Sequence, residues 1–245
     1  MAVYTIADLH LSTGTDKAMD VFGHRWIDYT NKIINRWKSV ISENDTVIIP
    51  GDISWAMTLD EAESDFALID SLPGKKILGK GNHDFWWSTL SKIKTFLEKN
   101  RFDSVSPLFN NAYAVENIIV CGTRGWFYDE KQQVTVGENV DFHKISSREA
   151  QRLKLSLDEA VKIRQKIEKD LPIVAFTHFP VVWGDFVCRE MIDLMHEYGV
   201  KSCYYGHIHG NYTVEQCSDF EGIRITLVSA DFLNFSPAPV FENKI

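Results

Sequence analysis

Side chains that could bind metal ions recur along the 245-residue chain in five short clusters. The clusters are Asp8-Leu9-His10, Gly51-Asp52, Gly81-Asn82-His83-Asp84, His178 and Gly206-His207-Ile208-His209. They offer carboxylate and amide oxygens and imidazole nitrogens but no sulfur, a set that suits Mn, Fe, Zn or Co. Five of the eight histidines lie inside the clusters. This combination predicts a two-metal hydrolase, and the chemistry of such sites is dominated by phosphoryl transfer.

The spacing within the clusters favours shared metals. Asp8 and His10 are two residues apart, as are His207 and His209, so each pair can turn to one metal from a segment that follows a strand. Asp52 has two carboxylate oxygens and can bridge two cations. Each cluster alone has an ordinary explanation, such as a capping aspartate or a polar turn. All five together, in order, favour one site.

The elements that must position these clusters are strands. Apolar runs directly before them predict strands at Val3–Ala7, Thr46–Pro50, Lys76–Leu78, Ile173–Thr177 and Ser202–Tyr205. Amphipathic segments predict helices at Arg25–Glu43, from Thr58 onward, and at Thr89–Lys99. Alternating strands and helices indicate parallel pairing. Because ligands of open α/β sheets gather outside the carboxyl ends of the strands, we expect the clusters to converge.

The second half of the chain has a different pattern. It predicts a hairpin of Ala112–Val115 and Ile118–Cys121, an exposed irregular segment at Tyr128–Ser147, helices from Ser146 to about Lys169 and at Glu190–Tyr198, and two antiparallel strands within Tyr212–Phe232. Hairpins and parallel units together favour a mixed sheet or two sheets. With no linker or repeat in sight, residues 1–245 are expected to form a single domain.

Composition limits the classes of function. The net charge of -8 argues against a broad nucleic-acid interface, which needs basic surface. It leaves an anionic substrate possible, because bound cations reverse the local sign. The four cysteines are scattered, as expected for free thiols in a reducing cytoplasm. The chain shows neither a signal peptide nor an apolar stretch of about 18 residues, so we expect a cytoplasmic protein with no membrane partner.

The order of the five clusters resembles the calcineurin-like metallophosphoesterase superfamily over residues 8 to 209, and the compact size is similar to its small bacterial members. The resemblance implies an α/β fold, a four-layer αββα sandwich with two mixed β-sheets. It also implies two divalent or mixed-valence transition metal ions, Mn first, with Fe, Zn or Co as alternatives. One ion would be held by Asp8, His10, Asp52 and His209. The other would be held by Asp52, Asn82, His178 and His207, with Asp52 as the bridge.

The same resemblance implies a phosphoesterase that hydrolyses a phosphomonoester or phosphodiester with a hydroxide held between the metals. His83 would face the substrate as general acid, and Asp84 would orient the His83 ring and raise its pKa. Arg124 follows a predicted strand in a glycine-rich segment. Its guanidinium would bind a phosphate oxygen, whereas the simpler interpretation is a surface arginine in a turn. Asn82 is a further candidate for substrate contact.

Other functions stay open at this point. The substrate would be a small phosphoester, with nucleotides among the candidates, and a nucleotide pyrophosphatase is one alternative. A second alternative is a scaffold of the same fold that binds partners without hydrolysis. Five of the seven tryptophans lie in or beside the motif loops, namely Trp55, Trp86, Trp87, Trp126 and Trp183. They either anchor the loops or form an aromatic rim that stacks on a base.

Overall fold

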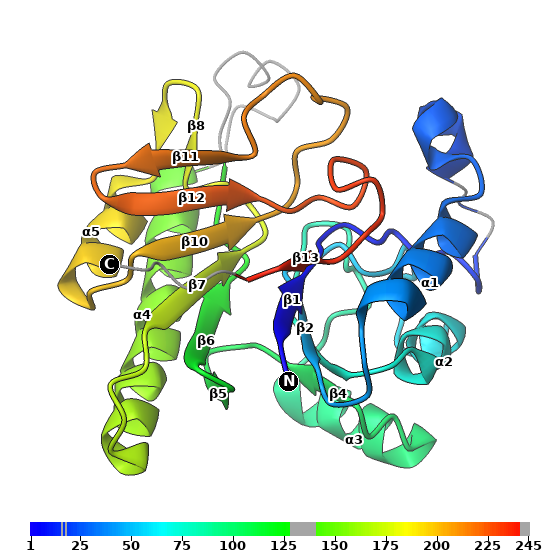
Figure 1. The fold of residues 1–245 in the computed structure, drawn as a ribbon, viewed down its shortest axis with the longest axis horizontal. Coiled ribbons are helices and arrows are strands. Elements are labelled where there is room, and N and C mark those ends of the chain that lie inside the picture. Colours follow the sequence, from blue (N-terminus) through cyan, green and yellow to red (C-terminus); the bar gives the residue numbers. More distant parts are fainter. Residues whose placement is uncertain (16, 18, 128–140, 241–245) are drawn as a thin grey trace.

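Two large mixed β-sheets form the centre of the molecule (Figure 1). The structure, a computed structural model, describes residues 1–15, 17, 19–127 and 141–240. Within these residues the first sheet has the strand order β13-β1-β2-β3-β4 and the second has the order β11-β12-β10-β7-β6-β5. The expectation of two mixed sheets is therefore confirmed.

The first sheet is built from four strands of the N-terminal half of the chain and one short strand near the C-terminus. Its strands are β1 (Val3–Thr5), β2 (Thr46–Ile49), β3 (Lys75–Leu78) and β4 (Val105–Pro107), all parallel, with β13 (Ala238–Pro239) antiparallel beside β1. Its helices are α1 (Tyr29–Val40), α2 (Glu63–Ser71) and α3 (Leu90–Asn100). Two short 3₁₀ turns, η1 (Met19–Phe22) and η2 (His24–Trp26), precede α1.

The second sheet follows in the chain. Its parallel strands are β6 (Ile118–Thr123), β7 (Ile173–Thr177), β10 (Ser202–Tyr205) and β12 (Ile223–Leu227), flanked by antiparallel β5 (Tyr113–Val115) and β11 (Cys217–Phe220). Its helices are α4 (Phe142–Ile167) and α5 (Arg189–Glu197). A small hairpin of β8 (Val182–Trp183) and β9 (Phe186–Val187) lies before α5.

Alternation along the strands produces the layers. In β2, Ile48 packs between the two sheets, where it joins Val174 and Phe176 of β7. Its neighbours Val47 and Ile49 face the opposite way and pack with α1, α2 and α3. The outer face of the second sheet packs in the same way against α4 and α5. Successive side chains on a strand point to opposite faces, so each buried strand serves two cores. The layers are thus α, β, β, α, as expected.

Several predicted bounds need correction. Helix α4 begins at Phe142, earlier than the predicted start at Ser146, because the carboxylate of Asp141 accepts from Lys144 N at 3.0 Å and caps the helix there. Of the segment predicted as irregular, 141 belongs to the cap, 142–147 is helical, and 128–140 lies outside the described residues. Helix α1 begins at Tyr29 and not at Arg25, since Asp28 has a left-handed φ of 55°.

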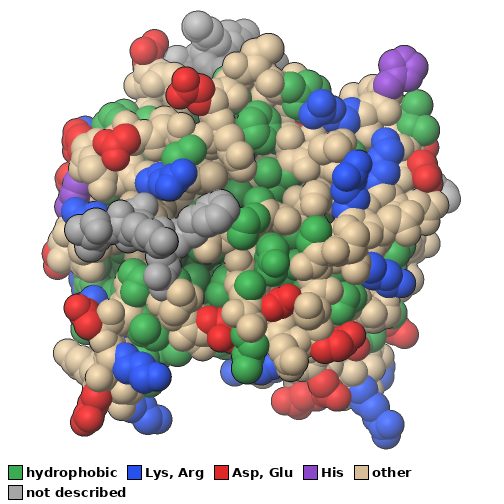
Figure 2. Space-filling view, viewed as in Figure 1, with side chains coloured by type: hydrophobic (Ala, Val, Ile, Leu, Met, Phe, Trp, Pro, Cys, Tyr) green, Lys and Arg blue, Asp and Glu red, His purple; other side chains and the backbone are tan. Residues whose placement is uncertain are grey.

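Other predicted elements are confirmed. Strands β7 and β10 have the expected bounds, and β5 and β6 form the expected hairpin. Strands β11 and β12 are antiparallel and meet near Asp219–Gly222. Both basic and acidic side chains are exposed on the face seen in Figure 2. Among the described helices, none is both long and apolar enough to cross a membrane.

The two sheets meet at one edge, where their carboxyl ends come together. Beyond β1, Ala7 N donates to Val228 O at 2.8 Å, and Ala230 N donates to Ala7 O at 2.9 Å. These bonds join the end of β1 to the end of β12, and thus the first sheet to the second. The polar clusters of the sequence follow the strands at this edge.

Candidate metal centre

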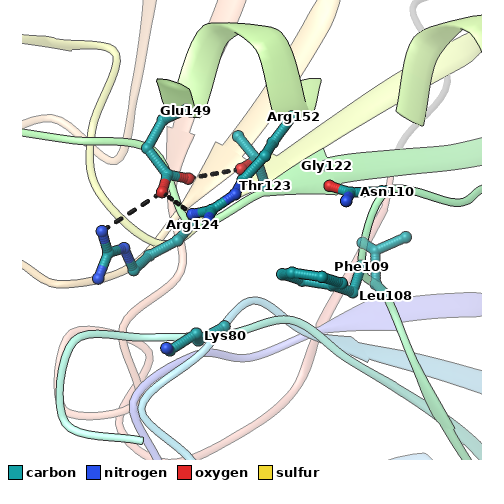
Figure 3. A pocket seen from close by; sticks show the side chains of 9 residues that line it. All are labelled: Lys80, Leu108, Phe109, Asn110, Gly122, Thr123, Arg124, Glu149 and Arg152. Atoms are coloured by element: carbon teal, nitrogen blue, oxygen red, sulfur yellow. Dashed lines mark hydrogen bonds and ion pairs between the residues drawn. The ribbon is translucent and has the colours of Figure 1, made fainter. Parts of the chain in front are cut away.

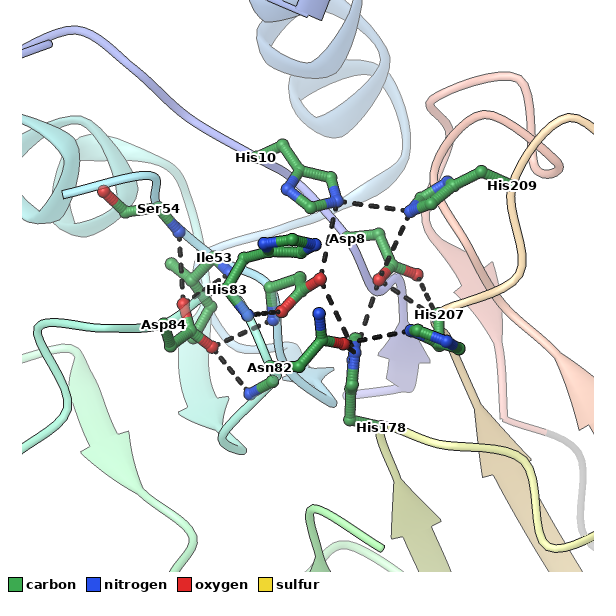
Figure 4. A network of polar contacts seen from close by, with 12 residues as sticks. Asp8, His10, Ile53, Ser54, Asn82, His83, Asp84, His178, His207 and His209 are labelled. Atoms are coloured by element: carbon green, nitrogen blue, oxygen red, sulfur yellow. Dashed lines mark hydrogen bonds and ion pairs between the residues drawn. The ribbon is translucent and has the colours of Figure 1, made fainter. Parts of the chain in front are cut away.

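Loops that follow strands of both sheets bring the predicted ligands together (Figure 4). Asp8 follows β1 and Asp52 follows β2, and His10 N donates to Asp52 O at 2.9 Å, so these two loops continue the pairing of their strands. His178 follows β7, and Gly206 N, which follows β10, donates to His178 O at 3.1 Å. Backbone hydrogen bonds between the loops therefore fix the positions of the predicted ligands, independently of contacts between their side chains.

Several of these residues have unusual backbone conformations. The φ angle is positive at Asp8 (61°), His10 (45°), Asp52 (52°) and His207 (70°). A left-handed conformation costs a non-glycine residue roughly 1–2 kcal/mol. Such strain persists where the surrounding structure enforces it, and it clusters at functional sites. Here it turns the ligand side chains away from the strand direction and toward a common centre.

Close backbone approach depends on two glycines. A Cβ at Gly206 would lie 2.5 Å from Asp8 Oδ2 and 2.5 Å from Ala7 Cβ. A Cβ at Gly81 would overlap Oδ1 and N of Asp52. Both glycines therefore make room for a predicted ligand carboxylate, a role that larger residues cannot fill.

One group of donors surrounds His209. Its Nε2 lies 3.2 Å from His10 Nε2 and 3.7 Å from Asp8 Oδ1. Asp8, His10 and His209 each offer a donor atom, and these atoms lie within 4.8 Å of one another. The group combines one carboxylate and two imidazoles, a common metal-binding set.

A second group surrounds Asn82. Its Oδ1 lies 2.7 Å from His178 Nε2 and 3.0 Å from His207 Nδ1. Asp52 Oδ2 lies between the two groups, 3.5 Å from His178 Nε2 and 3.6 Å from His10 Nε2. This oxygen is buried and has no hydrogen-bond partner among the described residues. Since a buried polar atom without a partner is costly, its position fits a metal ion.

The charges of the site also fit cations. Burial raises the pKa of Asp8 to about 6. Burial, and then the charges of Asp84 and Asp8, raise the pKa of Asp52 well above its usual range. Carboxylates crowded in this way are poorly stabilised by the protein alone. Bound cations would supply the missing positive charge.

The imidazoles are held neutral, which is the form that binds metals. Burial, followed by the charges of neighbouring histidines, lowers the pKa of His10 and of His178 well below the usual range. The same causes lower the pKa of His207 to about 3. His209 is the exception: burial lowers its pKa, but the charges of Asp8 and Asp231 outweigh burial and raise it.

The family comparison agrees with this geometry. The family model described as calcineurin-like phosphoesterase matches residues 1–211. The chain belongs to this family. It is therefore a hydrolase of phosphoester bonds and uses divalent metal ions. No match was found among curated proteins.

Solved structures share the family fold. The phosphopantetheinyl hydrolase from Mycobacterium tuberculosis matches with a TM-score of 0.52 and 15% identity, over 99% of this chain and 96% of that one. A protein of unknown function from Aquifex aeolicus matches with a TM-score of 0.52 and 17% identity, over 97% and 95%. A Thermus thermophilus protein matches with a TM-score of 0.53 and 9% identity, over 97% of each chain. At these identities the likeness concerns the fold alone.

His83 lies beside the donor groups of this calcineurin-like site. Its backbone N donates to Asp52 Oδ1 at 2.8 Å, and its ring lies 5.5 Å from the His10 ring between centroids. The Trp55 ring is closer, at 4.3 Å. The Nδ1 atom of His83 has no hydrogen-bond partner among the described residues. The ring is thus held by its backbone and by aromatic contacts.

The expected partnership between Asp84 and the His83 ring needs correction. The buried carboxylate of Asp84 accepts from five N–H groups: those of Asp52, Ile53, Ser54 and Gly81 in the backbone, and that of Trp86 in the side chain. Through these bonds the Asp84 carboxylate joins the loop after β2 to the loop after β3. It makes no hydrogen bond to the His83 ring. Burial, and then the charges of His209 and Lys17, lower the pKa of His83 to about 4, opposite to the expected direction.

Asp231 contacts a predicted ligand, although the sequence motifs did not single it out. Its buried carboxylate lies 2.9 Å from His209 Nδ1 and also accepts from Gly210 N and Tyr212 Oη, at 2.9 Å each. Carboxylates that bind the free nitrogen of a metal-binding histidine fix its orientation. The available signal was an acidic residue near the end of Tyr212–Phe232, the segment predicted to hold two strands, and such a residue is too common to predict a role.

The remaining candidates have mixed positions. Arg124 lies close to the ligands, because its carbonyl oxygen accepts from His178 N at 3.1 Å, but its guanidinium pairs with Glu149 at 3.3 Å. Among the tryptophans, Trp86 is buried, and Trp55 stacks on the His10 ring at 4.9 Å and 24°. Trp55 therefore packs against a predicted ligand, which supports the anchoring interpretation for this residue.

Proposed function

We propose that this family member hydrolyses phosphoesters with a dinuclear metal centre. Asp52 carries the proposal, since its unpartnered Oδ2 lies between His10 and His178, one from each donor group. A carboxylate with two groups of donors on either side suits two ions that share it as a bridge. A single ion would occupy only one of the two donor groups, the one around His209 or the one around Asn82.

The donor groups support the ligand sets that the family resemblance implies. Asp8, His10, Asp52 and His209 would hold one ion. Asp52, Asn82, His178 and His207 would hold the other. Ions of Mn, Fe, Zn or Co fit these oxygen and nitrogen donors, with Mn the first to be tested. When bound, two such ions polarise the phosphoryl group and lower the pKa of water.

The protein supplies the rest of the chemistry. We assign His83 to the leaving oxygen of the substrate, since its ring lies beside the donor groups and its Nδ1 is unpartnered. The ring is neutral in the protein alone, because its pKa is about 4. An anionic phosphoryl group beside the ring would raise this pKa and let His83 carry the proton that the leaving alkoxide needs. Asp84 contributes by holding the loop that carries His83.

A phosphomonoester or phosphodiester is the substrate class that we propose. The alternative of a scaffold without activity is disfavoured by the site itself, in which all seven ligand candidates and His83 lie together. A nucleotide pyrophosphatase would need a surface for a base. Trp55 lies 4.3 Å from the His83 ring, but its ring already stacks on His10. This stacking argues against Trp55 as the surface that binds a base.

The test combines metal analysis with turnover. Purified protein is stripped of metal with a chelator, reloaded with Mn²⁺, Fe²⁺, Zn²⁺ or Co²⁺, and assayed on alkyl and aryl mono- and diesters. We expect two bound ions per chain and hydrolysis only after reloading. The Asp52→Asn variant should lose both, while Asp60→Asn, a change at an exposed aspartate, should keep both. One ion per chain at full activity would overturn the dinuclear proposal.

A further inference from the structure

A hollow with Lys80, Arg124 and Arg152 in its wall lies between the loop after β3 and helix α4 (Figure 3). Its lining residues are Lys80, Leu108, Phe109, Asn110, Gly122, Thr123, Arg124, Glu149 and Arg152. Lys80 is two residues before the ligand candidate Asn82, and the carbonyl of Arg124 accepts from His178 N at 3.1 Å. The hollow therefore adjoins the Asn82 and His178 side of the site. It lies where loops after β3, β4 and β6 meet the start of α4.

One buried carboxylate organises two of the cations. Glu149 is 1% exposed, and its carboxylate accepts from Thr123 Oγ1 at 2.7 Å. The same carboxylate pairs with Arg124 at 3.3 Å and with Arg152. Glu149 thereby holds both guanidinium groups at the wall of the hollow. Burying a charged carboxylate is costly unless it is paired. Glu149 is paired with two arginines, which indicates that it positions both of them.

The third cation is not held by an ion pair among the described residues. Lys80 is half-buried, and within the described residues it makes no hydrogen bond or ion pair through its ammonium. It reaches the hollow from the loop after β3, while Arg124 comes from the end of β6. Three cations and one carboxylate give the hollow a net charge of +2. Like charges gathered beside a cleft favour an anionic ligand.

We propose that this hollow binds a second phosphate group of the substrate, so that the preferred substrates are phosphoesters that carry two phosphate groups. The proposal rests on the proposed hydrolase function. A phosphomonoester carries about -1.5 to -2 at pH 7, close to the charge of the hollow, whereas a carboxylate would neutralise only half of it. Arginine is well suited to phosphate because its guanidinium binds two oxygens at once.

The spacing also limits the linker between the phosphates. One residue, Gly81, separates Lys80 from Asn82, a span of at most about 7 Å between Cα atoms. Arg124 lines the hollow, and its carbonyl accepts from His178 N at 3.1 Å, so we expect a short linker between a phosphate in the hollow and a phosphate at the metals. Bisphosphates of small diols or sugars meet this condition.

Matched substrates test the proposal. Monophosphates and bisphosphates of α,ω-alkanediols, from ethane-1,2-diol to hexane-1,6-diol, both release a primary alkoxide oxygen and differ in the second phosphate on the departing alcohol. With the metal-loaded enzyme we expect kcat/KM to be higher for at least one bisphosphate than for its monophosphate. Lys80→Met should reduce this preference about tenfold, with a smaller loss on the monophosphate than on the bisphosphate. Arg152→Gln, on a different element, should act in the same direction.

The control is Lys75→Met, because Lys75 is exposed and lies at the opposite end of the same strand, β3. It should retain the full preference. Equal losses on monophosphate and bisphosphate in Lys80→Met would overturn the proposal, since the residue would then act only on the metal centre. Equal kcat/KM for both substrates in the wild type would overturn it as well.

A second measurement separates this proposal from the hydrolase function. If the metal-loaded enzyme hydrolyses none of these monophosphates, the proposed function fails and binding decides the role of the hollow. Inorganic phosphate is then titrated calorimetrically into protein kept free of metal by a chelator, where the acidic ligands repel it. Binding that Lys80→Met weakens about tenfold, and Lys75→Met does not change, supports the hollow. Absence of binding overturns it.

Discussion

The carboxylate of Asp231 lies 2.9 Å from Nδ1 of His209, and the other ring nitrogen of His209 faces Asp8 at 3.7 Å. The contact orients the ring, and with a proton on Nδ1 the lone pair of Nε2 is directed toward Asp8. Asp231 follows β12 in the second sheet, whereas Asp8 follows β1 in the first. His209 therefore lies between a carboxylate that follows a strand of the second sheet and a carboxylate that follows a strand of the first.

Replacing Asp231 by asparagine should weaken metal binding. Loss of a carboxylate partner of a metal-binding histidine typically costs about 10–100-fold in metal affinity or activity. We expect this decrease in competition titrations against a chelating dye, with the fold retained in circular dichroism. Asp185→Asn, at an exposed aspartate of the β8–β9 hairpin, should bind metal as the wild type does. Unchanged affinity in Asp231→Asn would show that the contact has no effect on the site.

Replacing His83 by alanine should affect substrates according to their leaving groups. An alkoxide needs a proton when it leaves, whereas a nitrophenolate does not, and general acids contribute about 10²–10⁴-fold. Hydrolysis of alkyl phosphoesters should therefore fall far more than that of nitrophenyl phosphoesters, measured as kcat/KM on both. The exposed His24 provides the control variant, His24→Ala. Equal losses on both substrates would remove the general-acid assignment.

Adding one methyl group at Gly81 should disrupt the centre. The Cβ of Gly81→Ala would overlap the carboxylate oxygen and the amide of Asp52, so Asp52 must move. We expect at least a tenfold loss of activity and reduced metal content by elemental analysis. Gly79→Ala lies in the same loop, but its Cβ would approach Pro50 Cα only to 3.3 Å. That variant should retain metal, and similar losses in both would point to general damage to the loop.

A buried lysine far from the chemistry should control stability. Lys76 is 1% exposed, and its ammonium donates to the carbonyls of Asp70 and Leu72 and to Ser104 Oγ. Lys76→Met removes these donors and leaves buried acceptors unpaired, at a cost of about 1–3 kcal/mol in the free energy of unfolding. Urea denaturation of the metal-free protein measures this change. The exposed neighbour supplies the matched variant Lys75→Met, with an expected change within about 0.5 kcal/mol.

The strand-end clusters were the part of the site that could be predicted. Asp8, Asp52 and His178 follow apolar runs that became β1, β2 and β7, and parallel strands bring their carboxyl ends to one edge. Residue type and position along the strand were enough for this inference. The αββα layers were predicted from the family resemblance and not from the residue pattern. In the structure, buried residues that alternate between the two faces of β2 account for these layers.

Contacts made by single side chains were beyond prediction. Asp84 follows His83 directly, which suggested a pair, but four backbone amides and an indole N–H from nearby loops occupy its carboxylate. Glu149 pairs with Arg124 and Asp231 with His209, each more than 20 residues away in the chain. The predicted start of α4 at Ser146 is too late because Asp141 caps the helix five residues earlier. Such choices depend on tertiary contacts rather than on local pattern.

The position of the ligands on both sheets has a consequence for synthesis of the protein. His207 N donates to Asp8 Oδ2 across 199 residues, so the site cannot assemble until β10 has left the ribosome. Until then the inner face of the first sheet, with Ile48 and Ile77, lacks the layer that covers it in the finished fold. Domains fold from the N-terminus as they emerge, and exposed apolar sheets aggregate. We therefore expect nascent chains stalled before β7 to need chaperones, and metal to be acquired only near the end of translation.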